Sequence, residues 1–257
     1  MHRTYFIQYV IFTAFTSTLV FSQVNTEAMR NSTNDYGFTN ALGFDLGFEK
    51  SKEEVVEIAG KYRLDFVAKN GLNSFLILSY ENGYQKINAK TNSIVNKGFS
   101  HLRFTKDISN KFFIELFTQY GFNDFLLMKE RFLLGSGIRY QVLSGDKTTT
   151  HLGFGFMQED ETYDIKENQE MSLLRSTNYI TFKLKLSDNT ELYNTAYFQF
   201  DTKRFDDNRI LFDSDMNISI NEKLSFNFVI NYRRDSEPHG DLGNTYIQLT
   251  NGFEYIF

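Results

Sequence analysis

The segment 224–233 reads LSFNFVINYR, and its pattern decides the fold. Apolar side chains occupy every second position and polar side chains stand between them, with Val229 as the exception. The apolar set is Leu224, Phe226, Phe228, Ile230 and Tyr232, and the polar set is Ser225, Asn227, Asn231 and Arg233. A strand separates these sets onto two faces, whereas a helix would scatter them around its circumference. The segment therefore predicts a β-strand with one apolar and one polar face.

The same alternation recurs along most of the chain, for example in 180–186 and in 209–220. Twelve strands are predicted, starting near Tyr36, Val55, Ser74, Ile94, Phe112, Leu126, Thr149, Leu173, Thr190, Arg209, Leu224 and Asn244. Most of them span about 11 to 15 residues, more than a soluble sheet usually needs but enough for a tilted strand that crosses a bilayer. Strand length therefore favours a membrane protein.

The connections between these segments alternate between two kinds. Short polar turns are predicted at 69–73, 106–110, 144–147, 186–189 and 221–223, and mostly longer connections at 49–54, 85–93, 123–126, 159–171, 201–208 and 235–243. Outer-membrane barrels have short periplasmic turns and longer outside loops. We therefore predict an all-β fold, a transmembrane antiparallel up-and-down β-barrel of about twelve strands over residues 36–257. The alternative is a soluble sandwich or a lipocalin-like barrel, in which one sheet face is solvated.

Composition excludes several classes of protein. No stretch within the predicted barrel approaches the roughly 18 apolar residues of a membrane-spanning helix. The chain has no cysteine, which removes disulfides, thiolate metal sites, thiol nucleophiles and a lipidated cysteine. A net charge of -5, without a dense Lys/Arg cluster, gives no electrostatic footprint for nucleic acid. The sequence therefore predicts no nucleic-acid partner, no metal and no cofactor.

The N-terminus has the pattern of a secretory signal peptide. His2 and Arg3 begin a weakly basic segment, and the mostly apolar residues 5–21 carry no charge. Small or modest side chains precede Gln23, so we predict a cleaved signal peptide over 1–22 and an N-terminal periplasmic segment over 23–35. The alternative is a retained membrane anchor. Export places the protein in the bacterial outer membrane, in contact with its lipid.

The last predicted strand, 244–257, ends on an aromatic residue. Gly252, Phe253, Tyr255 and Phe257 resemble the terminal signal by which the barrel assembly machinery recognises its substrates. An open terminal strand has unpaired N–H and C=O groups that hydrocarbon cannot satisfy, so it must pair with the first strand. We expect the assembly machinery and periplasmic chaperones as partners during biogenesis, and a monomer as the final state.

If the apolar faces meet lipid, the polar faces line the lumen, where selectivity is decided. The predicted lumen residues are Lys61, Arg63, Asp65, His101, Arg103, Glu115, Gln119, Arg131, Arg139, Asp213 and Asp215. Hairpin pairing predicts that Glu115 lies near Arg103 and that Gln119 lies near Arg131.

Two functions fit this lumen. In the first, the charges neutralise each other and fill a narrow structural or stress-related barrel. In the second, surplus basic residues Arg103, Arg131 and Arg139 attract anions through a small-solute channel.

An outer-membrane enzyme is a distant third alternative, and we predict no catalytic residues. The His-x-Ser pattern of lipid-hydrolysing barrels is absent from the sequence. His239 with Asp235 and Asp241 fits a solvated loop better than a protease site. The acidic stretch 159–170 lacks the spacing of an EF-hand and is interpreted as a solvated outside loop.

Five stretches carry a resemblance to a known family, namely VNTEAMR at 24–30, GFSHLRF at 98–104, ELFTQY at 115–120, RFLLGSGIRY at 131–140 and YRRDSEP at 232–238. In these stretches the sequence resembles a family of bacterial outer-membrane proteins of unknown function, described as salt-induced outer-membrane proteins. It covers nearly all of the predicted mature chain. It implies the barrel and its location, and it implies no substrate and no catalytic residue.

Overall fold

The fold is taken from a computed structural model, which describes residues 36–50, 54–87, 90–165, 169–239 and 243–256. The predicted signal peptide, the segment 23–35 and Phe257 lie outside the described residues. The described residues form twelve strands and one short 3-10 helix. These are β1 (Gly37–Lys50), β2 (Glu54–Val67), β3 (Leu72–Ile87), β4 (Lys90–Asp107), β5 (Phe112–Asn123), η1 (Asp124–Leu126), β6 (Met128–Ser144), β7 (Thr148–Tyr163), β8 (Gln169–Lys185), β9 (Thr190–Asp201), β10 (Asn208–Ser219), β11 (Leu224–Asp235) and β12 (Thr245–Ile256).

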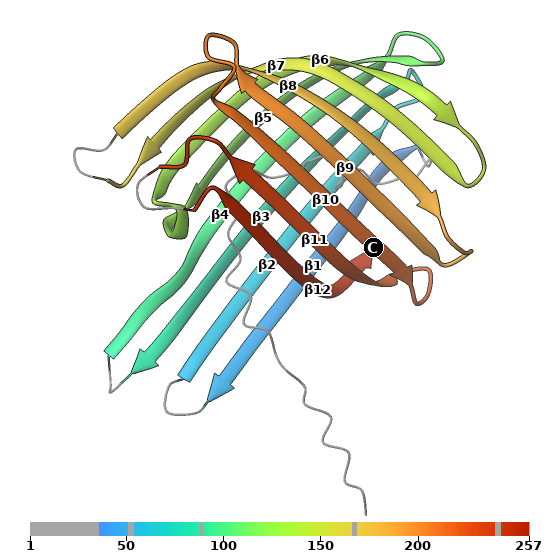
Figure 1. Ribbon diagram of the computed structural model, residues 1–257. Coiled ribbons are helices and arrows are strands. Elements are labelled where there is room, and N and C mark those ends of the chain that lie inside the picture. The colour runs from blue at the N-terminus through green and yellow to red at the C-terminus, as the bar shows by residue number, and fades with distance from the viewer. Residues whose placement is uncertain (1–35, 51–53, 88–89, 166–168, 240–242, 257) are drawn as a thin grey trace, which may run out of the picture.

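The strands form one closed antiparallel barrel in which each strand pairs with its neighbours in sequence, and β1 pairs with β12 (Figure 1). The predicted fold is confirmed, and every predicted strand start lies within four residues of the observed one. In the described ranges no helix is long and apolar enough to cross a membrane. Closure satisfies the backbone groups of the edge strands, which a barrel in hydrocarbon requires.

The barrel has two unlike ends. The turn end contains the connections 68–71, 108–111, 145–147, 186–189 and 220–223, together with the start of β1 and the end of β12. The loop end contains the other connections, and the longest of these are 202–207 and 236–244. In outer-membrane barrels the end that holds both termini and the short turns faces the periplasm.

The pairing registers of the strands place alternate residues on the inner and outer faces of the barrel wall. Cross-strand partners such as Arg63↔Ile77 and His101↔Gln119 are both odd-numbered, so in the central parts of β1 to β11 the odd residues point inward. Large apolar side chains such as Phe44, Leu116 and Phe156 are exposed on the opposite face, where lipid would cover them. Inside, charged and polar side chains predominate among the buried residues. The core of this barrel is therefore largely ionic.

Glycines let β6 and β7 come close together in the middle of the wall. Gly137 and Gly155 are direct cross-strand partners, and a Cβ on Gly155 would lie 2.5 Å from the carbonyl oxygen of Ser136. On the same inner face, the ring of Tyr179 covers Gly153 and leaves no room for a Cβ there. The ring of Tyr179 on β8 therefore packs against the backbone of β7.

Candidate functional site: the charged lumen

All of the predicted lumen residues are odd-numbered and occupy inward-facing positions of their strands. Lys61 and Asp215 are half-buried. The remaining ones are buried, namely Arg63, Asp65, His101, Arg103, Glu115, Gln119, Arg131, Arg139 and Asp213. They are spread over β2, β4, β5, β6 and β10, so they line the barrel over much of its height and do not form a single compact site.

Hairpin pairing brings together some of the predicted neighbours. An Nη1 atom of Arg103 lies 3.5 Å from Oε2 of Glu115, as expected from the turn between β4 and β5. The Arg103 guanidinium also lies 5.0 Å from the centre of the Phe117 ring, within range of a cation–π contact. Gln119 and Arg131 border the same cavity.

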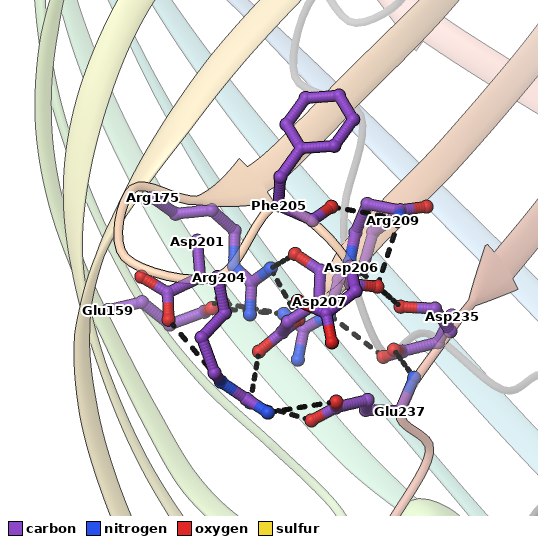
Figure 2. Close-up of polar contacts among 12 residues, drawn as sticks. Glu159, Arg175, Asp201, Arg204, Phe205, Asp206, Asp207, Arg209, Asp235 and Glu237 are labelled. Carbon is purple, nitrogen blue, oxygen red and sulfur yellow. Dashed lines mark hydrogen bonds and ion pairs between the residues drawn. The ribbon is translucent and has the colours of Figure 1, made fainter.

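A cluster of buried ion pairs crosses the lumen at the loop end (Figure 2). We define this loop-end cluster as Arg131, Glu159, Glu161, Arg175, Asp207, Arg209 and Asp235. Its members come from β6, β7, β8, β10, β11 and the connection before β10. It therefore ties together strands that are not neighbours in the barrel wall.

Two arginines hold the cluster together. Arg175 donates from Nε to Glu159 at 2.8 Å and from Nη1 to Asp207 at 2.9 Å. Arg209 donates from Nη1 to both carboxylate oxygens of Glu159 at 2.9 and 3.0 Å, and from Nη2 to Glu161 at 3.2 Å. Charged groups this deeply buried are tolerated only when each has such partners.

An exposed ion pair ties the two longest loops together over this cluster. Arg204, in the 202–207 connection, donates from Nη1 and Nη2 to the two carboxylate oxygens of Glu237 at 2.9 and 2.7 Å. It also donates from Nη2 to Asp207 at 3.3 Å, which links the loops to the buried cluster (Figure 2). Hydrogen bonding to Glu237 is the main cause that raises the pKa of Arg204 above its usual value.

The structure corrects the interpretation of 159–171 as a solvated outside loop. β7 continues to Tyr163 and β8 begins at Gln169, so Glu159 and Glu161 are strand residues that point inward. Both are almost completely buried, and Arg131, Arg175 and Arg209 surround them. The connection 85–93 is likewise mostly strand, because β3 ends at Ile87 and β4 begins at Lys90.

The predicted surplus of positive charge is also corrected at two of its three positions. Arg103 lies 3.5 Å from Glu115, and Arg131 lies 3.9 Å from Glu161. The third, Arg139, has its guanidinium 6.0 Å from the centre of the Tyr179 ring. Sequence reasoning missed Arg175 and Arg209, which are buried inside the barrel, whereas Arg233, also buried there, was placed on the polar face of its strand. Each of these arginines is odd-numbered, like the inward-facing residues of the same strands, and this parity could have identified them as lumen residues.

A central chamber lies between the loop-end cluster and the turn-end half of the lumen. Arg131 borders it on β6, and Arg103 and Glu115 border it on β4 and β5. Buried aromatic and apolar side chains form much of its wall, including Tyr179, Tyr197 and Leu211. The hydroxyl of Tyr179 donates to Oε2 of Glu115 at 2.7 Å.

His239 lies in the loop between β11 and β12, and its ring centre is 3.7 Å from that of Tyr163. Burial lowers the pKa of His239, and the charge of Arg209 lowers it further. A histidine whose folded pKa is depressed binds protons more weakly when folded, so its contribution to stability is lost as the pH falls below about 6.5. We expect an NMR titration of its imidazole to give a midpoint below about 6.5, with a His239→Gln variant to assign the signal. A midpoint at or above that value would show that the ring is not packed as described.

Comparison with known proteins places the chain in a family. A family model described as "Protein of unknown function, DUF481" matches residues 62–257. The chain belongs to the DUF481 family. This confirms the family resemblance seen in the sequence, whereas no match is found among curated protein sequences.

Solved structures share the architecture of this DUF481 protein. The NanC porin is 6% identical, with a TM-score of 0.53, and the alignment covers 84% of this chain and 98% of the porin. An outer membrane channel from Pseudomonas putida is 10% identical, with a TM-score of 0.50, and the alignment covers 89% of this chain and 100% of the channel. At such low identity the likeness shows the fold alone, which is that of an outer-membrane β-barrel.

Proposed function

We propose that this DUF481 protein is a small-solute channel of the outer membrane whose loop end is closed by ion pairs in its resting form. The observation that carries the proposal is the loop-end cluster, which crosses the lumen directly above the central chamber. Its charges are paired with one another, and it joins strands along the half of the barrel from β6 to β11. Rearrangement of the loops that meet at Arg204 and Glu237 would open the path to the chamber.

The second candidate is a sealed structural or stress-related barrel. It is favoured by the near-complete burial of the inward side chains, with Arg175 at 0% and Glu159 at 1% relative exposure. In that case the ion pairs would only brace the wall. Anion preference through Arg103, Arg131 and Arg139 is a finer alternative for the channel, and the first two of these arginines are ion-paired.

The proposal also includes the path to the membrane. Export uses the signal peptide 1–22, and the assembly machinery recognises the C-terminal strand through Phe253, Tyr255 and Phe257. Phe253 and Tyr255 are exposed on the outward face of β12, where a partner protein or lipid can reach them. The proposed protein is a monomer that catalyses no reaction.

The experiment is conductance of the purified, folded protein in a planar lipid bilayer. We expect discrete current steps from the wild type, and an open probability raised several-fold by Arg204→Ala. Loss of an exposed ion pair costs little stability, so this variant should fold. Lys185→Ala is the matched control, because it removes an exposed pair with Asp188 at the turn end and should leave gating unchanged. If the wild type and Arg204→Ala are both folded and electrically silent, the sealed barrel is correct and the channel is refuted.

A further inference from the structure

A phenylalanine of the loop 202–207 lies on the outer surface of the barrel. The side chain of Phe205 is 64% exposed, and its ring centre lies 4.9 Å from that of Phe200 and 5.7 Å from that of Phe198. Phe198 and Phe200 are even-numbered residues of β9, so they point outward. The ring of Phe205 points away from the charged side chains of the loop-end cluster (Figure 2). We define these three residues as the outer aromatic patch.

Hydrogen bonds within the loop fix the position of this ring. The backbone N–H of Arg204 donates to the carbonyl oxygen of Asp201 at 3.2 Å, and that of Asp207 donates to the carbonyl oxygen of Arg204 at 3.0 Å. The side-chain amide of Asn208 donates to the carbonyl oxygen of Phe205 at 3.2 Å. The loop therefore holds a large apolar ring outward, where water would forfeit the free energy of its burial. Exposed apolar patches of this kind mark interaction surfaces.

The patch lies where the apolar band of the outer wall ends. Thr202, the first residue of the loop, donates from its backbone N–H to the carbonyl oxygen of Leu174 at 3.0 Å, and the Leu174 side chain is exposed on the outward face of β8. Two residues nearer the loop end, the hydroxyl of Ser172 donates to Asp160 of β7 at 2.6 Å, also on the outward face. In membrane proteins, aromatic side chains concentrate at this boundary between apolar and polar surface.

Bilayer lipid is the partner that this surface fits. Phe198 is the direct cross-strand partner of Ile210 on β10, and Phe212 follows on the same outward face. The patch is therefore continuous with the surface that lipid covers in an outer-membrane barrel. We propose that Phe205 anchors the 202–207 loop in the outer leaflet of the membrane, at the boundary between its headgroups and its acyl chains.

This anchor gives the loop a second kind of attachment. Arg204 pairs with Glu237 at 2.7 Å, and Asp207 accepts a hydrogen bond from Arg175 at 2.9 Å inside the lumen. Ion pairs thus hold the loop from within, and the bilayer holds it from outside. The inference concerns the membrane and does not depend on whether the barrel conducts.

The first test places a single tryptophan at the anchor, which is possible because the chain has none. Phe205→Trp is studied in vesicles whose lipids are brominated either near the headgroup or near the ends of the acyl chains. The references are Phe154→Trp, at an outward position in the middle of β7, and Asp164→Trp, at an exposed position just after β7. We expect the bromines near the headgroup to quench Phe205→Trp about 3-fold or more strongly than Asp164→Trp.

Two outcomes of this test would overturn the proposal. Quenching of Phe205→Trp equal to that of Asp164→Trp would place the ring in water. Stronger quenching by the bromines at the chain ends, as expected for Phe154→Trp, would place the ring in the hydrocarbon interior.

The second test asks whether the ring holds the loop. A spin label on Lys203→Cys reports the mobility of the loop, since Lys203 is exposed and the chain has no native cysteine. Phe205→Ser should raise the mobility of this label in vesicles about 2-fold or more, because it removes the anchor. Phe154→Ser is the matched control, because it removes an outward phenylalanine outside the patch, and it should leave the mobility unchanged. Equal mobilities with the two serine variants would refute the anchor, even if Phe205→Trp is quenched by lipid.

Discussion

Replacing Gly155 by alanine is expected to destabilise the folded barrel by about 3 kcal/mol or more. The new Cβ would lie 2.5 Å from the carbonyl oxygen of Ser136, which belongs to the backbone of the partner strand and cannot move aside alone. β6 and β7 would have to separate where Gly137 and Gly155 face each other. The measurement is the fraction of protein that migrates as the compact, heat-modifiable form on a gel without boiling.

Gly60→Ala is the control for this substitution. Gly60 lies in the middle of β2, and a Cβ added there would meet nothing within 4 Å. The change should leave the folded fraction at the wild-type level, because it adds the same methyl group to a strand glycine without a clash. If Gly155→Ala folds as well as Gly60→Ala, the close approach of β6 and β7 is not as described.

Arg175→Met should lower the free energy of unfolding by about 3 to 5 kcal/mol, measured by urea titration in lipid vesicles. The arginine is fully buried and bridges Glu159 on β7 to Asp207 before β10. Methionine fills a similar volume, but it leaves the buried carboxylates without one of their cationic partners. The free-energy penalty of a buried, poorly compensated charge is larger than the stabilisation that an ordinary ion pair provides.

Lys185→Met is the matched control for the arginine. It removes the cation of the Lys185–Asp188 pair at the turn end, where the two side chains are 41% and 105% exposed. Exposed ion pairs of this kind contribute little, so the expected change is within about 0.5 kcal/mol. Similar losses from the two variants would mean that the loop-end cluster does not brace the barrel.

The strands could be predicted from the sequence because their outward-facing residues are apolar wherever they lie within the hydrocarbon layer of the membrane. β5, β9 and β11 begin at Phe112, Thr190 and Leu224, as predicted. Each has apolar and polar residues in regular alternation, and this pattern is set locally by the two environments that the wall separates.

The loop end was predicted less well for a physical reason. Beyond the apolar band the outward face is polar too, as at Asp160 and Thr162, so the alternation with inward Glu159 and Glu161 is not visible in the sequence. A run of acidic residues then looks like a solvated loop. The partners of Glu159 come from β8 and β10. Whether these strands bring their arginines close to Glu159 depends on the diameter of the barrel and the stagger of its strands, and a local sequence pattern does not specify either.

The barrel requires the even-numbered face of β11 to meet lipid, and site-directed spin labelling of this strand measures which face does so. The chain has no native cysteine, so single cysteines at Asn227, Phe228, Ile230 and Asn231 carry the labels without interference. In vesicles, labels at Phe228 and Ile230 should be highly accessible to oxygen dissolved in the hydrocarbon, and labels at Asn227 and Asn231 should be shielded from it. High oxygen accessibility at the two asparagine positions, with shielded labels at Phe228 and Ile230, would contradict the barrel described.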